Sequence, residues 1–306
     1  MSMFRRVAFF IGLNILVVVT LSLVMSLFGI GNYVTAAGMN YGSLIVFCLV
    51  WGMGGAFISL LLSKKMAKWT MGVQIIDPQT SNADLRDLVQ TVHQIARQAG
   101  LSKMPEVGYY QSPEVNAFAT GPSKNNSLVA VSTGLLSSMN KQSVEGVLAH
   151  EVAHIANGDM VTMTLLQGVV NAFVMALARI VAFAIDSFVS SRDDNGQGLG
   201  WIARSFVIMG LEILLFIPGS MLIAYFSRKR EFRADHGGAR FAGRDKMIGA
   251  LRSLQRVHDV NMQIPEKSPA FASLKISSNK GTKFAMLFSS HPPLETRIER
   301  LERAAL

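Results

Sequence analysis

The sequence predicts an α-helical membrane protein with four transmembrane helices and a water-soluble α+β domain on one side of the bilayer. Composition, four apolar runs and the placement of basic residues carry this prediction. Half of the 306 residues are hydrophobic and 16% are charged, whereas ordinary soluble domains carry roughly 25% charge. The mean hydropathy is +0.34. This composition excludes a disordered chain and disfavours a purely soluble globule.

Four apolar runs are long enough to cross a bilayer, which takes about 20 residues. We expect an N-terminal transmembrane hairpin in residues 1–62, with spans at about 7–28 and 42–62. A second hairpin in residues 160–226 has spans at about 160–189 and 201–226. The first span exceeds the apolar region of a signal peptide, about 7–15 residues, so we expect it to stay uncleaved. Arg179 and Glu212 fall inside the second hairpin and should pair there, unless the hairpin is only partly inserted.

Lysine and arginine flank the spans on one side, and the opposite loops hold only Arg192. That side should be the cytoplasm, because cytoplasmic loops retain basic residues. Both chain ends and two soluble segments, residues 63–159 and 227–306, then face the cytoplasm and together reach an ordinary domain size. The net charge of +9 is explained by this topology, and no nucleic-acid partner is expected. A single cysteine, Cys48, excludes a disulfide framework and a cysteine-based metal site.

Residues 150–154 have the pattern H-E-x-x-H. On a helix, His150 and His154 lie one turn apart and point the same way, so both imidazoles can reach one zinc ion. Glu151 lies about 100° around the helix, beside the metal, where a base can take a proton from zinc-bound water. The pattern therefore predicts one zinc ion per chain and a catalytic carboxylate.

A catalytic zinc takes three protein ligands and keeps one position open. Glu231 and Asp235 follow the fourth span and again lie one helical turn apart. Glu231 would complete a His/His/Glu site, although a charged helix start beside a membrane is also common. Asp235 would then accept a hydrogen bond from the outer nitrogen of a ligand histidine and fix its tautomer.

These motifs resemble the HtpX-type membrane zinc proteases of bacteria, the heat-stress relatives of the CaaX prenyl endopeptidases. The resemblance covers nearly the whole chain and is carried by residues 116–121, 129–136, 150–171, 227–235 and 291–297. It implies a gluzincin-type zinc-peptidase domain with zinc at His150, His154 and Glu231, and with Glu151 catalytic. It also implies an inner-membrane enzyme that cleaves membrane proteins on the cytoplasmic side during envelope quality control.

Residues 291–293 read His-Pro-Pro, a loop signal because the two prolines exclude helix at that point. The resemblance puts His291 and Arg297 near the active site. His291 would stabilise the oxyanion of the reaction, and Arg297 would orient a carboxylate or the substrate. The alternative is an ordinary helix start with Arg297 on a solvated face.

Residues 115–120 and 128–132 read as short strands joined by a turn-rich linker. An edge strand can hold an extended substrate through backbone hydrogen bonds, so Asn116 and Ala119 are candidate substrate contacts. The alternative is an ordinary sheet edge. Residues 259–283 are rich in serine and lysine with weak periodicity, and we expect a mobile loop there.

The prediction is thus a zinc-dependent metalloendopeptidase of the bacterial inner membrane that hydrolyses misfolded or damaged membrane proteins. An intramembrane protease is disfavoured, because Lys141 and Glu145 shortly precede the H-E-x-x-H motif. A non-catalytic zinc-binding scaffold or chaperone is disfavoured, because a structural site does not need Glu151. The sequence makes no prediction of the oligomeric state.

Overall fold

The computed structural model describes residues 38–192, 198–263 and 285–304, together with Val19, Leu23, Val34 and Thr35. The chain divides into two compact units. One unit, here called the apolar-helix unit, comprises Met1–Ser59 and Met163–Ile223. The other, the catalytic unit, comprises Leu60–Thr162 and Ala224–Leu306.

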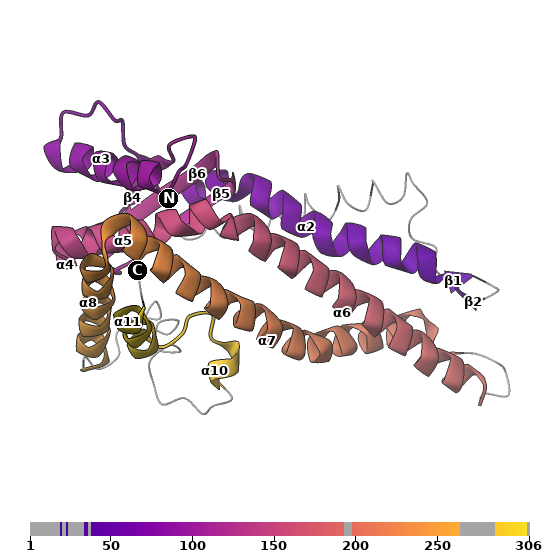
Figure 1. The fold of residues 1–306 in the computed structure, drawn as a ribbon. Coiled ribbons are helices and arrows are strands. Elements are labelled where there is room, and N and C mark those ends of the chain that lie inside the picture. Colours follow the sequence, from indigo (N-terminus) through magenta and orange to yellow (C-terminus); the bar gives the residue numbers. More distant parts are fainter. Residues whose placement is uncertain are drawn as a thin grey trace. The chain divides into compact units, whose positions relative to one another are not determined.

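Three helices of the described residues are long and apolar enough to cross a membrane. They are α2 (Tyr41–Thr70), α6 (Asp159–Ser190) and α7 (Gly200–Ala242), the long helices of Figure 1. They contain the predicted spans 42–62, 160–189 and 201–226. The predicted span 7–28 lies outside the described residues, apart from Val19 and Leu23. Large side chains such as Phe173, Trp201 and Phe206 are exposed on these helices, as expected for contact with lipid.

Helices α2 and α6 approach one another backbone to backbone within the apolar-helix unit. A Cβ atom on Gly52 would lie 2.6 Å from the backbone nitrogen of Ala172. A Cβ atom on Gly168 would lie 3.2 Å from the Cα atom of Met53. Glycine is therefore required at Gly52, since small residues allow apolar helices to pack closely where no hydrophobic driving force exists.

The predicted pairing of Arg179 with Glu212 is confirmed. The Arg179 guanidinium lies 2.6 Å from Glu212 Oε1 and donates to the carbonyl oxygen of Met175 at 3.0 Å. Its Cζ atom also lies 5.1 Å from the ring centroid of Phe47. These contacts compensate a charge that would be costly in an apolar environment.

The catalytic unit contains a four-stranded sheet in the order β3-β4-β6-β5. Its strands are β3 (Gln74–Ile75), β4 (Glu106–Tyr110), β5 (Ala117–Ser123) and β6 (Asn126–Ser132). Strands β4 and β6 are parallel, and the other pairs are antiparallel. Both predicted strands are confirmed, and β5 is an edge strand of this sheet. A second, two-stranded sheet pairs β1 (Val34–Thr35) with β2 (Gly38–Met39).

Helices α3 (Ala83–Gln98) and α5 (Lys141–Asn157) share the main core with β4 and β6, and the short helix α4 (Thr133–Ser138) follows β6. Fully buried aliphatic side chains form this core, among them Val92, Val129, Val131, Leu148 and Val152. Asn82 caps α3 by accepting hydrogen bonds from the amides of Asp84 and Leu85. The buried face of α5 thus fixes the helix that carries the H-E-x-x-H motif.

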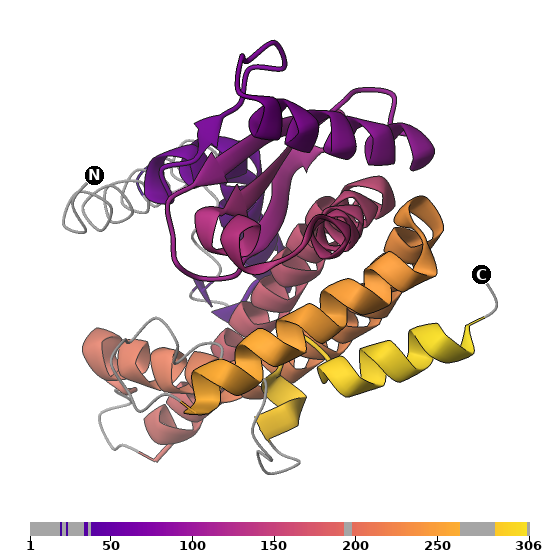
Figure 2. The ribbon, with the colours of Figure 1, turned by 90° about the vertical axis from the view of Figure 1, so that its left-hand side faces the viewer.

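Helix α8 (Arg244–Gln263) packs along α5, and α11 (Leu294–Arg303) packs on α8 (Figure 2). Close packing of α5 on α8 requires Gly146, where a Cβ atom would clash with the carbonyl of Lys246. The short helix α10 (Ala285–Phe288) precedes α11. The prediction of a loop over residues 259–283 is wrong for residues 259–263, because α8 continues to Gln263. Its residues 264–283 lie outside the described residues.

Candidate metal centre

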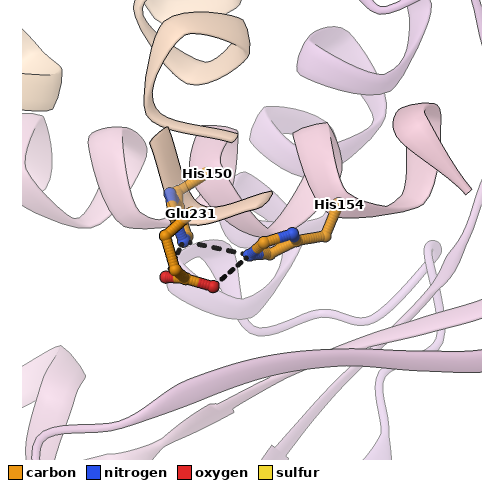
Figure 3. Close-up of side chains that lie close together, drawn as sticks. All are labelled: His150, His154 and Glu231. Atoms are coloured by element: carbon orange, nitrogen blue, oxygen red, sulfur yellow. Dashed lines mark hydrogen bonds and ion pairs between the residues drawn. The ribbon is translucent and has the colours of Figure 1, made fainter. Parts of the chain in front are cut away.

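Two helices bring three potential ligands together. Asn140 caps the start of α5, and Gly158 ends it with a left-handed φ of 73°. Between them, His150 and His154 lie on one face of the helix, and Glu231 reaches them from α7 (Figure 3). One ligand atom from each residue lies within 4.8 Å of the other two. The structure therefore assembles the three predicted ligands within the catalytic unit.

The spacing of these atoms fits a tetrahedral ion. The two Nε2 atoms of His150 and His154 lie 3.1 Å apart. Nε2 of His150 lies 3.4 Å from Oε2 of Glu231, and Nε2 of His154 lies 3.4 Å from Oε1 of the same carboxylate. A tetrahedral zinc ion holds its nitrogen and oxygen ligands about 3.3 Å apart. Two imidazoles and one carboxylate are also a ligand set found in catalytic zinc sites, so the donors fit zinc in both geometry and chemistry.

The Glu231 carboxylate is fully buried. Burial alone would raise its pKa, but hydrogen bonds with His150, His154 and His291 hold the pKa far below its ordinary value. Burial also opposes charge on the histidines. Hydrogen bonds to Asp159 and Glu231 nevertheless raise the pKa of His154 to about 9, and those to Asp235 and Glu231 raise the pKa of His150. The carboxylates around these histidines therefore favour a proton or a cation at the site.

Asp235 lies beside His150, the place that the sequence predicts for it. Its Oδ1 atom lies 2.9 Å from His150 Nδ1, the nitrogen that faces away from Glu231. Arg297 donates hydrogen bonds to both oxygens of the same carboxylate, with Nε 2.8 Å from Oδ2 and Nη2 2.6 Å from Oδ1. Arg297 is only 6% exposed, which excludes the solvated-face alternative. Of the two roles predicted for Arg297, this geometry favours the orientation of a carboxylate.

His291 lies at the site, and its Nδ1 atom is 2.9 Å from Glu231 Oε2. Its side chain is 56% exposed, so the rest of the ring faces solvent. Arg228 of α7 holds the preceding segment by donating to the carbonyl oxygens of Leu287 and Ser289. The predicted loop at residues 291–293 is confirmed, since α11 begins only at Leu294.

Asp159 is a site residue that the sequence analysis missed. Its Oδ2 atom lies 2.7 Å from His154 Nδ1, and the residue is 3% exposed. The left-handed Gly158 turns the chain between α5 and α6, so Asp159 comes back toward the preceding helical turn. A glycine followed by an acid, four and five residues after His154, was the available signal.

Residues 82–305 match the family model described as Peptidase family M48. The chain is also 52% identical to "Protease HtpX" of Shewanella pealeana over 298 residues, which cover 97% of this chain and 99% of the relative. This chain belongs to peptidase family M48. It is 50% identical over 305 residues to "Protease HtpX homolog" of Bacillus licheniformis, with 97% of this chain and 99% of that relative covered.

Membership of family M48 makes the chain a metalloprotease, and the three long apolar helices among the described residues fit a membrane protein. A crystal structure of S. mikatae Ste24p has a TM-score of 0.61 to this chain at 15% identity. The match covers 95% of this chain and 62% of Ste24p, so this chain spans less than two thirds of that protein. The likeness at this identity concerns the fold alone.

The remaining site residues that the sequence predicts lie on α5, in β5 and directly before β5. Glu151 is half-buried on α5, next to the ligand His150. Asn116 precedes β5, and its backbone pairs with Ser132 while its side chain is exposed. Ala119 pairs with Val129 across the sheet and packs toward the core. An extended substrate beside β5 would thus meet the backbone of this strand, not the Ala119 side chain.

Proposed function

We propose that this chain is a zinc-dependent endopeptidase of the bacterial inner membrane. It hydrolyses peptide bonds of misfolded or damaged membrane proteins on the cytoplasmic side, as part of envelope-stress quality control. The observation that carries the proposal is the convergence of His150, His154 and Glu231 next to Glu151. A purely structural zinc site would not need Glu151.

The site would hold one zinc ion per chain through His150, His154 and Glu231. When bound, zinc would supply a Lewis acid that activates water and polarises a peptide carbonyl. Asp235, clamped by Arg297, holds a proton on Nδ1 of His150, which leaves Nε2 free to act as a ligand.

Glu151 would act as the general base and acid. It takes a proton from the attacking water and then delivers that proton to the leaving amine. His291 would donate a hydrogen bond to the oxyanion that forms as the carbonyl is attacked. Its position on Glu231 and its open side support this role. The edge strand β5, which includes Ala119, and the preceding Asn116 would bind the substrate in an extended form.

Membrane-protein substrates are favoured by the short chain distances between the ligands and the apolar helices. Helix α6 begins at Asp159, five residues after His154, and the predicted fourth span ends five residues before Glu231. Unfolded cytoplasmic loops of other membrane proteins are therefore the natural substrates. The runs of lysine and arginine that flank the spans support a cytoplasmic catalytic unit with both chain ends on the same side.

The proposal is tested with the purified full chain and an unfolded membrane protein, with and without a chelator. Glu151→Ala should retain zinc and lose cleavage, whereas Glu145→Gln, which removes another α5 carboxylate, should retain both. Glu145 pairs with Lys246 and lies six residues before Glu151 on the same helix. Cleavage by Glu151→Ala at the wild-type rate would contradict the proposal. Products cut inside an apolar span would favour intramembrane cleavage.

Orientation is tested by labelling intact cells with a membrane-impermeant thiol reagent after Cys48 is replaced. A cysteine at Asn195, in the loop between the third and fourth spans, should react. A cysteine at the exposed Asp245 of the catalytic unit should not react until the membrane is permeabilised. The reverse pattern would invert the proposed topology.

A further inference from the structure

We propose that Asp159 is a positioning residue of the metal centre, and that its carboxylate fixes the orientation and tautomer of His154. The inference rests on the proposed zinc site. It assigns a role to a residue that begins α6 and takes no part in the chemistry proposed above.

The hydrogen bond between Asp159 and His154 determines which ring nitrogen is free. Asp159 Oδ2 lies 2.7 Å from His154 Nδ1, and the two side chains are 4% and 11% exposed. An ionised carboxylate can only accept, so Nδ1 must carry the proton. The lone pair of a neutral His154 is then on Nε2, which lies 3.4 Å from Glu231 Oε1 and 3.1 Å from His150 Nε2. The bond therefore aims a ligand lone pair at the point where the three donors converge.

A short turn of the chain places the carboxylate. Helix α5 ends at Asn157, and the Gly158 amide donates to the carbonyls of His154 and Ile155. The left-handed Gly158 then reverses the direction of the backbone, and α6 begins at Asp159. The ligand His154 and the start of an apolar helix are thus joined both by five residues of chain and by a side-chain hydrogen bond.

The two ligand histidines are supported from different elements. Asp235 of α7 holds His150 and is itself fixed by two hydrogen bonds from Arg297. Asp159 of α6 holds His154. Each histidine thus has its own buried carboxylate, an arrangement typical of metal-ligating histidines.

A second role for Asp159 has to be separated from this one. An acidic residue in the first turn of a helix stabilises that helix through the helix dipole. Asp245 offers a matched control, because it occupies the first turn of α8 and is exposed. A dipole role predicts loss of stability without loss of metal affinity, and a positioning role predicts the opposite.

The experiment measures zinc affinity of the full chain by competition with a chromophoric chelator, the absorption spectrum of the Co²⁺-loaded chain, and thermal unfolding of the metal-free chain. Asp159→Ala should lower zinc affinity by about 10- to 100-fold and change the Co²⁺ spectrum. Asp159→Asn should recover part of the affinity, because its amide oxygen still accepts the Nδ1 hydrogen bond. Asp245→Ala should keep the wild-type affinity and spectrum.

Wild-type zinc affinity in Asp159→Ala, with only a lower unfolding temperature, would overturn the inference. If that variant does not fold, ¹⁵N NMR of histidine in the zinc-loaded wild type decides. A proton on Nδ1 of His154 supports the inference, and a proton on Nε2 overturns it. Zinc binding without peptide cleavage by the wild type would instead refute the proposed function and leave this inference standing.

Discussion

Each of the two units of the chain contains a cluster of charged residues, and the clusters differ in burial and in what surrounds the charges. In the apolar-helix unit, Arg179 and Glu212 are partly buried and pair at 2.6 Å. In the catalytic unit, the Glu231 carboxylate lies 3.4 Å from the Nε2 atoms of two histidines. The other ring nitrogen of each histidine contacts Asp235 or Asp159. The first cluster is a single ion pair of one arginine and one carboxylate. The second presents three ligand atoms to a common point.

A pair of opposite charges inside the fold does not by itself mark a functional site. A buried ion needs a compensating partner wherever it lies. A single opposite charge is enough in the apolar-helix unit, where the pair joins two helices. In the catalytic unit, carboxylates bind the Nδ1 atoms of both histidines. The Nε2 atoms, which face Glu231, therefore require a cation or a proton.

The largest effect is expected when a ligand of the catalytic unit is removed. His154→Ala and Glu231→Ala should each reduce bound zinc from one ion per chain to nearly none, because two protein ligands remain. Cleavage should be lost with the metal. Metal analysis of the purified variants checks this, with Glu212→Gln as the control from the other cluster. Full zinc retention in either ligand variant would remove that residue from the site.

A smaller loss is expected for His291→Ala, which lies at the edge of the same cluster. Removal of one oxyanion donor costs about 10²–10³ in turnover and has little effect on ground-state binding. The variant should keep its zinc and its KM and lose most of its kcat. His236→Ala, an exposed histidine of α7, is the control. Zinc loss would indicate a ligand role for His291, and unchanged turnover would leave it a structural loop residue.

The comparison also explains which parts of the site the sequence could predict. His150 and His154 share one helix, so their spacing along the chain already gives their spacing in space. The role of Glu231 depends on packing of α7 against α5, which no local pattern encodes. Burial of Arg297 depends on how α11 packs on α8. Asp159 was missed because its contact requires the left-handed turn at Gly158.

The same limit applies to the fold. Apolar runs and alternating strands are local signals, so the spans 42–62, 160–189 and 201–226 and both strands of the hairpin β5–β6 were predictable. The final turn of α8, residues 259–263, has a polar composition that local patterning reads as loop. These residues extend a helix that is held by packing of earlier α8 residues, such as Met247 and Leu251, on α5 and α11.

Removal of one partner of the Arg179–Glu212 pair should destabilise the apolar-helix unit and leave the metal centre intact. Glu212→Leu should lower the free energy of unfolding by about 3 kcal/mol, because it leaves Arg179 uncompensated. The double variant Arg179→Leu/Glu212→Leu should lose less, since no charge remains unpaired. Thermal unfolding in detergent and zinc content are the measurements. A zinc loss in Glu212→Leu would contradict the separation of the two clusters.

The smallest effect concerns a third group of charges, on the surface of the catalytic unit. Glu106 of β4 pairs with Lys64 at 2.9 Å and with Lys68 at 2.7 Å, and its side chain is 41% exposed. Partial burial raises the pKa of Glu106, but hydrogen bonds from Lys68 and Lys64 outweigh it and lower that pKa below its ordinary value. Both lysines follow the predicted span 42–62, and their ion pairs connect the end of α2 to β4.

A carboxylate whose pKa is lower in the folded chain stabilises that chain above its unfolded pKa, about 4.3 for glutamate, and less as the pH falls through the folded value. Glu106→Gln should therefore reduce the free energy of unfolding by at most about 1 kcal/mol at pH 7, because exposed ion pairs are weak. The difference from wild type should shrink toward pH 3. Unfolding at both pH values measures it, with Glu299→Gln, whose pair with Arg303 is exposed, as the control. A difference that grows on acidification would reverse the sign assigned to this pair and show that the lysines do not stabilise the ionised carboxylate.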